Sequence, residues 1–482
     1  MPGIVVNTSV RTGPSTTNQS PTATFFVVGQ TERGPATTPK MVTSIAEYES
    51  IFGEYVSHGQ VHQQVQTFFE EGGAQVYVSR VVGASPTVGS LEFVDTNGDP
   101  SITLTAIGAG AWSTNLEASV ESAGTGFAIK FFLSDELVYT TGEVATAAAA
   151  VTRINASPVA ARYATAEDEE NLVPVLTAAT AFGAGDDNRS TITSSTYTDA
   201  LSSFGTDLGP GAVAIPGENG AGVWNAMLTH CVNANRVALM AFPAAYSAAE
   251  AAADASAMSA EPNAEYGSMF FPWVKMVTES GATLTISPEG YAAAKRSIAH
   301  NSIGPWQPYA GKMAESKFIT GTSVAVDKTA GDYLDENRVN ALRIISGTVR
   351  IYGARSVSND EDNYRFNTAR EMLNYVVARS QTALEDLVFS PIDGRASLFS
   401  KVEARLVAML EPIRIAGGLY EAFDTAGKRI DYGYSVQVND AINPLSQLAG
   451  GLVRAKVGIR VSSVGDQIQV DVTKSNLTAS VV

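Results

Sequence analysis

The chain has 482 residues, of which 45% are hydrophobic and 17% charged, and its formal net charge is −17 at pH 7. This length exceeds one ordinary hydrophobic core and predicts roughly two to four domains. The excess of acidic residues argues against nucleic acid as the main ligand, because phosphate binding needs concentrated Lys and Arg.

The front of the chain and its cysteine content indicate where the protein is made. Cys231 is the only cysteine, which leaves no partner for an internal disulfide and suits a reducing cytosol. The first residues show no basic segment followed by an apolar one, so we expect no signal peptide. No apolar run approaches the roughly 18–20 residues that span a bilayer. We therefore expect synthesis in the cytoplasm and no direct membrane insertion.

Both ends of the chain have the pattern of β-strands that lack a partner nearby in the sequence. The front carries a short apolar run, and the back alternates apolar with polar residues, which is the period of a half-buried strand. Unpaired strands recruit other chains, so these ends predict a protein that is joined to copies of itself. The residues concerned are Ile4, Val5 and Val6 at the front and Ile468, Val470 and Val472 at the back.

Apolar strands alternate with helices over residues 21–83 and 188–335, which predicts an α/β core with a largely parallel sheet covered on both faces. After a strand at 24–28, Ser44 and Glu47 form a capping box that begins a helix ending at Gly53. A second helix begins near Val61 and ends at glycines. The other predicted elements are strands at 75–81, 212–217, 236–240 and 269–277 and helices at about 221–234 and 247–258.

Residues 84–187 have a different composition and predict an acidic, β-rich domain inserted into the core. Fourteen Asp and Glu residues face only Lys130, Arg153 and Arg162, which leaves −11. Short strand-like pieces are separated by turn signals such as Asn97-Gly98. Such a segment indicates a solvent-facing outer lobe, and the alternative is a surface that is acidic only for solubility.

The last third predicts an α+β domain over residues 336–464, with helices at about 366–384 and 397–411. Strands are expected at 349–352, 436–438 and 453–461. From residue 340 to the end, sixteen Lys and Arg meet fifteen Asp and Glu, so this part is close to neutral.

No catalytic or nucleotide-binding motif emerges. The segment Gly304–Met313 resembles a phosphate loop, but its glycine spacing is too long and its two prolines remove amide donors. His230 and Cys231 are adjacent, and on a helix their side chains diverge by about 100°. A buried structural cysteine is therefore the better interpretation. No G-x-S-x-G elbow occurs.

Two patterns imitate metal sites. His58 and His62 have the i, i+4 spacing of a shared metal, but no third ligand lies nearby in the sequence, and a solvated helix face is the better interpretation. The segment Asp95–Asp99 imitates the start of a calcium loop, but Pro100 and Ala106 stand where glycine and glutamate are needed. A hairpin turn is expected instead. We predict no cofactor, no metal and no enzyme activity.

Several short motifs occur one after another along the chain, in the same order as in a known family. They are spread over the whole chain except the acidic insertion. Together these segments resemble contractile tail sheath proteins of myophages and related contractile injection systems. The segments are MPGIVV at 1–6, FVVGQTERGP at 26–35, FFEEGGAQVYVSRV at 68–81, GAVAIPG at 211–217, NRVAL at 235–239, FPWVK at 271–275, NRVNALR at 337–343 and RIYGARS at 350–356.

The last motif looks like the family's tryptophan–glycine–alanine–arginine–threonine signature, with Tyr352 for Trp and Ser356 for Thr. The segment near Ser287–Gly290 lacks the family's second glycine-rich stretch. The residues that match the family signatures are Gly34, Pro35, Gly72, Gly73, Asn340, Gly353, Ala354 and Arg355.

The resemblance implies a structural subunit of a virion tail sheath. Arms at 1–20 and 465–482 would donate strands to neighbouring copies in a helical homo-oligomer, residues 336–464 would face the tail tube, and the insertion would project outward. Tail tube, baseplate and tail terminator proteins would be its partners, without nucleic acid. The sheath would assemble in a metastable extended state and contract to drive the tube through the host envelope.

Two alternatives remain open from the sequence. The first is a sheath subunit of a phage-derived extracellular or type VI-like contractile injection system. The second, of a different class, is an α/β enzyme whose oligomerisation is incidental.

Overall fold

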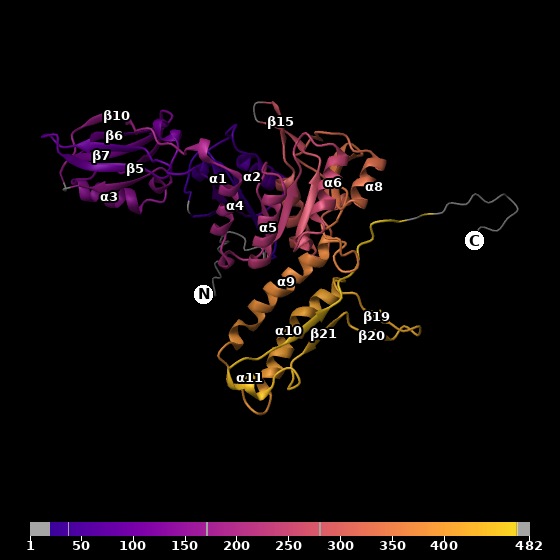
Figure 1. Cartoon of the computed structure of the whole chain (residues 1–482). Helices are drawn as coiled ribbons and strands as arrows, with labels where there is room; N and C mark the ends of the chain where they lie inside the picture. Colours follow the sequence, from indigo (N-terminus) through magenta and orange to yellow (C-terminus); the bar gives the residue numbers. More distant parts are fainter. Residues whose placement is uncertain (1–19, 37, 170–171, 279–280, 469, 471–482) are drawn as a thin grey trace, which may run out of the picture.

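The computed structural model describes residues 20–36, 38–169, 172–278, 281–468 and 470. The chain forms an outer lobe over 84–187, a central α/β core, and a C-terminal lobe that begins with helix α9 (Asn367–Leu384) (Figure 1). This is a mixed α/β architecture with several sheets, as the sequence predicts.

An eight-stranded sheet forms the core, in the order β18-β17-β13-β12-β11-β1-β3-β2. The pairs between β17 and β3 are all parallel, and the edge strands β2 and β18 pair antiparallel. The predicted boundary at 335/336 falls just before β17, yet β17 and β18 belong to this sheet. The strands are β1 (Phe25–Gly29), β2 (Lys40–Val42), β3 (Val76–Arg80), β11 (Ala212–Ala214), β12 (Val237–Ala241), β13 (Gly267–Phe271), β17 (Val339–Ile345) and β18 (Thr348–Ile351).

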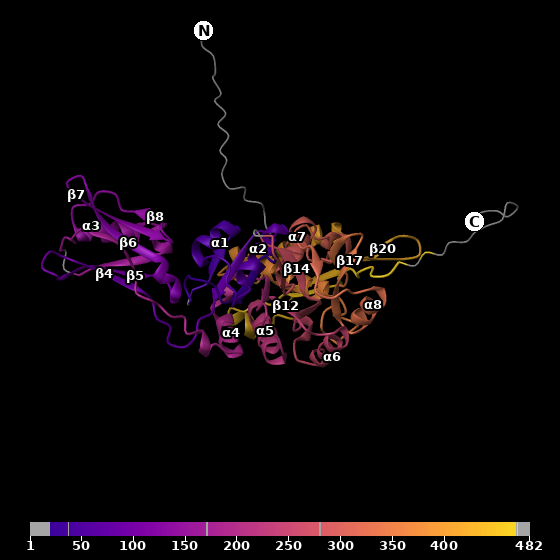
Figure 2. The same ribbon diagram turned by 90° about the horizontal axis from the view of Figure 1, so that it is seen from above.

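Helices cover both faces of the sheet, because successive side chains of a strand point to opposite faces. In β1, Phe25 and Val27 join one hydrophobic cluster and Phe26 and Val28 join the other. Figure 2 shows the two helix layers on opposite sides. One layer contains α1 (Ile45–Phe52), α2 (Val61–Glu70) and α7 (Glu289–Ser302), and the other α4 (Ser194–Ala200), α5 (Ala221–Ala234), α6 (Ala248–Met258) and α8 (Lys328–Glu336).

Only one of the two hydrogen bonds of the predicted capping box at α1 is present in the structure. Ser44 Oγ accepts a hydrogen bond from the Glu47 N–H at 3.1 Å, as expected. The Glu47 carboxylate, however, accepts from the backbone N–H and the hydroxyl of Thr43, each at 2.8 Å, and not from Ser44. The side chain reaches one residue further back, and the helix still begins and ends where the sequence predicts.

The predicted strand at 269–277 is two strands in two sheets. β13 ends at Phe271, and β14 (Val274–Val277) pairs antiparallel with β15 (Thr283–Ile286) and β16 (Gly321–Thr322). Pro272 lies between β13 and β14 and has no N–H to continue the core ladder. The chain therefore leaves the core sheet at this residue.

The outer lobe has its own hydrophobic cluster between two sheets and helix α3 (Ala147–Ala156). Asn97 and Gly98 lie in the turn of its first hairpin, where Asp95 Oδ1 accepts from the N–H groups of Asn97 and Asp99. The expected hairpin is thus confirmed. Its strands are β4 (Ser90–Val94), β5 (Pro100–Ala106) and β9 (Ala164–Asp168) in one sheet and β6 (Leu116–Ala123), β7 (Gly126–Leu133), β8 (Glu136–Thr140) and β10 (Thr177–Ala181) in the other.

The C-terminal lobe is built on α9 and α10 (Ser397–Ile415), which extend away from the core (Figure 1). Both helices agree with the predicted ones. In α10, Leu398, Val402, Leu406 and Met409 recur at helical spacing and form the buried stripe of the lobe. The remaining elements are β19 (Ala422–Phe423), β20 (Arg429–Asp431), β21 (Tyr434–Gln437), α11 (Leu445–Ala449) and β22 (Lys456–Ile459).

Candidate intersubunit surface and its joint with the core

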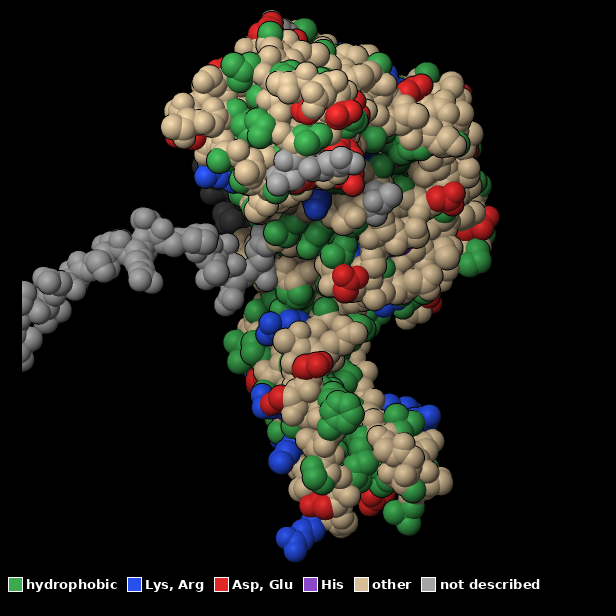
Figure 3. Space-filling model, turned by 90° about the vertical axis from the view of Figure 1, so that its left-hand side faces the viewer, with side chains coloured by type: hydrophobic (Ala, Val, Ile, Leu, Met, Phe, Trp, Pro, Cys, Tyr) green, Lys and Arg blue, Asp and Glu red, His purple; other side chains and the backbone are tan. Residues whose placement is uncertain are grey.

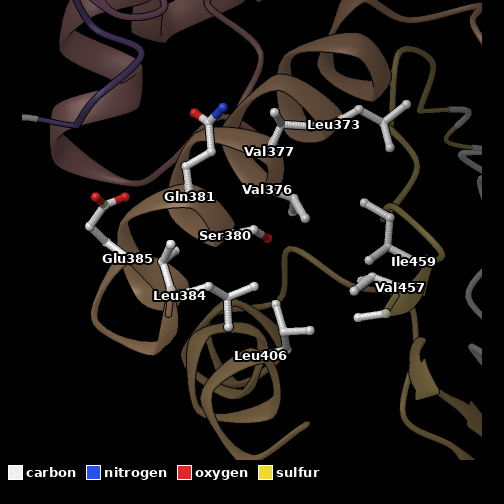
Figure 4. A pocket seen from close by; sticks show the side chains of 12 residues that line it. Leu373, Val376, Val377, Ser380, Gln381, Leu384, Glu385, Leu406, Val457 and Ile459 are labelled. Carbon is white, nitrogen blue, oxygen red and sulfur yellow. The ribbon is translucent and has the colours of Figure 1, made fainter. Parts of the chain in front are cut away.

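An apolar groove of about 590 Å³ lies in the C-terminal lobe between α9, α10 and β22 (Figure 4). Helix α9 supplies one wall, because residues three and four positions apart share a face. Strand β22 supplies the other wall through alternate residues, while Lys456 points away. The groove is lined by Leu373, Val376, Val377, Ser380, Gln381, Leu384, Glu385, Val388, Leu406, Ala455, Val457 and Ile459.

Strand β22 beside the groove is an edge strand. Within the described part of the chain it pairs only with β21, from Tyr434↔Ile459 to Gln437↔Lys456. A strand edge without a partner presents backbone N–H and C=O groups to another strand. Groove and edge together can receive an extended segment that has apolar side chains on one side.

The same lobe exposes large apolar side chains. Phe389 is fully exposed, and Leu445, Ile415, Ile430 and Tyr420 are 83%, 71%, 67% and 58% exposed. Figure 3 shows hydrophobic side chains over much of the lobe. Such a concentration on one part of a molecule marks a contact surface.

The family-signature residues at the joint between core and lobe hold the chain in place. Asn340 of β17 is fully buried, and its amide donates to the carbonyl oxygens of Met269 and Arg355 at 3.1 and 2.9 Å. Its oxygen accepts from the Arg355 N–H at 2.7 Å. A Cβ at Gly353 would lie 3.0 Å from Asn340 Cα, and Ala354 is buried. These residues fix the segment between β18 and α9 against the core sheet.

Arg355 extends this joint toward the surface. Its guanidinium lies 2.8 Å from Asp335 and 3.3 Å from Glu361 and contacts the ring of Phe366. Arg365, next to Phe366, pairs with Glu361 and with Asp466 at 3.6 and 3.2 Å. A chain of ion pairs therefore connects the signature arginine to the start of the predicted C-terminal arm.

The other signature residues lie in the core, away from the groove. Gly34 has φ +102°, its carbonyl accepts from Arg80 at 2.8 Å, and Pro35 follows it. Gly72 has φ +99°, and a Cβ at Gly73 would lie 2.3 Å from the Phe68 ring. These positions require glycine for backbone conformation and close packing. The sequence motif thus identifies the joint and the core, whereas the groove has no motif that could have identified it.

The predicted arm residues fall largely beyond the described structure. Ile4, Val5, Val6 and Val472 lie outside the described residues. Ile468 and Val470 are 86% and 74% exposed and are not in a strand. Their side chains are thus available to another molecule.

The histidines are placed differently from the prediction of a solvated helix face. His62 lies 3.0 Å from Glu49 with its side chain 11% exposed, and His58 precedes α2 and accepts a hydrogen bond from Arg189. Burial lowers the pKa of His58, and the Arg189 charge adds to this effect. Cys231 is buried in α5, and its burial raises the pKa of the thiol.

Among the described residues, no group of three or more His, Cys, Asp or Glu side chains could hold a metal ion. None of the helices formed by these residues is long and apolar enough to cross a membrane.

No family model and no curated protein matches the sequence. Solved structures match over nearly the whole chain, however. The sheath complex of an extracellular contractile injection system, PVC, in its contracted state is 15% identical, with 98% of each chain covered and a TM-score of 0.57. A sheath tail protein from Listeria innocua is 13% identical, with 87% of this chain and 89% of that chain covered and a TM-score of 0.59.

The chain has the sheath-protein fold. The helical sheath of the anti-feeding prophage, also contracted, agrees, with 14% identity, 98% and 99% of the two chains covered and a TM-score of 0.55. The resemblance to sheath proteins that the sequence indicated is therefore confirmed at the level of the overall fold. At these identities the likeness establishes the fold alone, so the role of each surface follows from its own chemistry.

Proposed function

We propose that this chain is the structural subunit of a contractile tail sheath. Copies of it polymerise helically around a tail tube in a metastable extended state and contract to drive the tube through an envelope. The observation that carries this proposal is the apolar groove beside the open edge of β22, in a chain with the sheath-protein fold. The proposed role is mechanical, without a cofactor or catalysis.

The groove receives a strand from a second copy of the same chain. The predicted strand at 4–6 is short and apolar, and the one at 467–472 alternates apolar with polar residues. Both patterns suit an edge that gives main-chain hydrogen bonds and a groove that takes alternate side chains. Each copy donates arms at 1–20 and 465–482 and also receives them. Because donor and receiver are different surfaces, the contact is head-to-tail, and its repetition gives a helical tube when the rotation between copies does not close into a flat ring.

The parts of the chain lie at different distances from the axis of the proposed tube. The C-terminal lobe, with its exposed apolar side chains and near-neutral charge, faces the tail tube. The outer lobe, where acidic residues prevail, projects into solvent and keeps neighbouring tails apart through like-charge repulsion. Baseplate and tail terminator proteins bind the two ends of the assembled sheath.

Truncation and a substitution in the groove test the strand exchange by electron microscopy of the purified chain. We expect the full chain to form tubes, and chains lacking 1–19 or 465–482 to remain folded monomers. Val377→Asp, which puts a charge into the groove, should also abolish tubes, whereas Thr382→Asp on the same helix but outside the groove should not. Normal tubes from both truncations would disprove the exchange.

The fold is shared by more than one kind of contractile machine, since the similar structures include both injection systems and a Listeria sheath tail protein. A phage tail sheath and the sheath of a phage-derived injection system therefore use the same proposed chemistry. Neighbouring genes for capsid and terminase would identify the phage case, and their absence would identify the other.

A further inference from the structure

Arg296 of α7 lies between two parts of the chain that the proposed mechanism must connect. Its Nε and Nη2 donate to the two carboxylate oxygens of Glu371 on α9, at 2.6 and 2.7 Å. Its Nη1 donates to the carbonyl oxygen of Thr22 at 2.5 Å. The side chains of Arg296 and Glu371 are 2% and 1% exposed. A two-pronged pair of this kind fixes orientation as well as distance.

Thr22 lies just after the predicted N-terminal arm, and α7 holds this part of the chain at three positions. Besides the Arg296 bond, the Thr22 hydroxyl and His300 Nδ1 share a hydrogen bond at 2.8 Å. The backbone N–H of Ser20 donates to Asn301 Oδ1, also at 2.8 Å. The root of the arm is therefore fixed to one helix of the core.

Glu371 lies one turn into α9, the helix that leads from the core into the C-terminal lobe (Figure 1). Leu373 and Val376, which lie two and five positions after Glu371 on that helix, line the groove. The buried guanidinium thus links the root of the donated arm directly to the helix that forms the receiving groove, and His300, whose Nε2 lies 4.0 Å from the Glu371 carboxylate, lies beside it.

We propose that Arg296 is a positioning residue that couples the N-terminal arm to the orientation of the C-terminal lobe. This inference rests on the proposed sheath function. A neighbour that pulls on the arm displaces Thr22 and Arg296, and through Glu371 it turns the helix that holds another neighbour's strand. The movement of one subunit then biases the next one, which makes contraction cooperative along the sheath.

The root of the C-terminal arm has a weaker connection to the same joint. Asp466 pairs with Arg365, but the two side chains are 44% and 43% exposed. Exposed ion pairs contribute little because water screens them. The coupling through Arg296 is therefore the dominant one, and Arg365→Met should leave the orientation of the lobe unchanged.

Helix α7 also provides a matched control. Lys295, next to Arg296, forms a 2.6 Å ion pair with Glu71, and the two side chains are 1% and 0% exposed. Glu71 also accepts from the backbone N–H groups of Lys317, Phe318 and Ile319, all inside the core. This pair is as buried as the first one but contacts neither arm nor lobe.

The test compares two double variants, which remove both charges so that neither leaves an unpaired buried charge. These are Arg296→Met with Glu371→Met, and Lys295→Met with Glu71→Leu. Spin labels at Lys328→Cys in the core and Lys401→Cys in the lobe, in a full chain with Cys231→Ser, report the distance between the two parts. We expect the first double variant to broaden this distance distribution at least twofold and the control to leave it narrow.

Arg296→Lys serves as a second variant, because it keeps the buried charge but loses the two-pronged geometry. It should broaden the distribution to an intermediate width, and its sheaths should contain segments contracted to different extents. An unchanged distribution in both Arg296 variants, or equal broadening in the Lys295 control, would overturn the coupling. If the wild-type chain formed no tubes, the proposed function would fail, whereas the distance measurement would still decide the coupling.

Discussion

The guanidinium of Arg80 lies 3.7 Å from the carboxylate of Asp187, with both side chains buried where the outer lobe joins the core. Arg80 ends β3, just before the chain enters the outer lobe, and Asp187 lies where the chain returns. Arg80 also donates to the carbonyl oxygens of Gly34 and Ala109 at 2.8 Å each. Burial lowers the pKa of Arg80 to about 10, which still leaves it charged at neutral pH. The neck consists of the two chain segments, around residues 81–87 and 186–190, through which the chain enters and leaves the outer lobe. One side chain therefore connects the core to this neck and to the lobe.

Arg80→Met should loosen this neck. Asp187 keeps its ion pair with Arg189 at 2.9 Å, but the buried carbonyl oxygens of Gly34 and Ala109 lose their donor, and each buried polar group left unpaired costs about 1–3 kcal/mol. Urea unfolding measures this loss, and limited proteolysis should show new cleavage near residues 83–86 and 187–190. Lys130→Met is the control, since its pair with Glu121 is partly exposed to solvent, with side chains 31% and 45% exposed, and should cost less than about 1 kcal/mol. Equal losses in the two variants would contradict the role of Arg80.

Excision of residues 86–185 should leave a folded core that still assembles. The lobe has its own hydrophobic cluster, and the two segments of the neck already pair with each other. Gly83 N–H donates to the Asp187 carbonyl at 2.7 Å, and the Asn188 side-chain amide donates to the Ala84 carbonyl at 2.6 Å, and all four residues remain after the excision. A short Gly-Ser linker can therefore join the cut ends. Electron microscopy of the excised chain measures assembly, and a complete loss of tubes would place the outer lobe among the inner contacts.

Glu289 at the start of α7 should make folding less favourable as the pH rises. Burial raises its pKa from 4.5 to about 7, although the Ser287 hydroxyl donates to it. The folded state therefore keeps a proton that the unfolded state releases, so the stabilisation is complete below pH 4.5 and is lost as the pH rises through 7. Glu289→Gln should be more stable than wild type at pH 8, by up to about 3 kcal/mol, and nearly equal at pH 4.5.

Unfolding in urea at pH 4.5 and pH 8 measures the effect of Glu289→Gln. The matched control is Glu250→Gln in α6, where hydrogen bonds from Ser247 lower the pKa of the carboxyl. That substitution should destabilise the protein at pH 8, which is the opposite sign. A Glu289→Gln variant that is less stable than wild type at pH 8 would show that folding does not raise the pKa of Glu289.

The sequence correctly predicted helices whose ends are set by residues close to them in the chain. Helix α5 has the predicted bounds 221–234, and α1 begins after Ser44 and ends at Gly53. Helix α7 was not predicted, because it is buried nearly all round and shows no apolar stripe. Its charged residues Lys295 and Arg296 are paired with glutamates 224 and 75 residues away. Partners at such separations are invisible to a local pattern.

The candidate site divides in the same way. The motifs at 337–343 and 350–356 indicate only a family resemblance, and the structure shows Asn340 of the first hydrogen-bonded to Arg355 of the second. The groove could not be predicted, because its apolar residues on α9 and β22 lie about 80 positions apart and have the spacing of ordinary core residues. Only the packing of the lobe leaves them partly uncovered.

Gly353→Ala should destabilise the joint between core and lobe. Gly353 has no positive φ, so the cost is steric: the new methyl group would lie 3.0 Å from both Cα and Oδ1 of Asn340. Overpacking of a buried site costs about 1–3 kcal/mol, and here it also displaces the amide that bonds Arg355.

Gly222→Ala is the matched control, because Gly222 lies in α5 with nothing within 4 Å of its Cβ position. Alanine there should stabilise the helix by about 0.5–1 kcal/mol. Thermal or urea unfolding of the two variants should therefore shift in opposite directions. A Gly353→Ala variant as stable as wild type would show that Asn340 can move aside, and that the glycine of the signature is not required for packing at the joint.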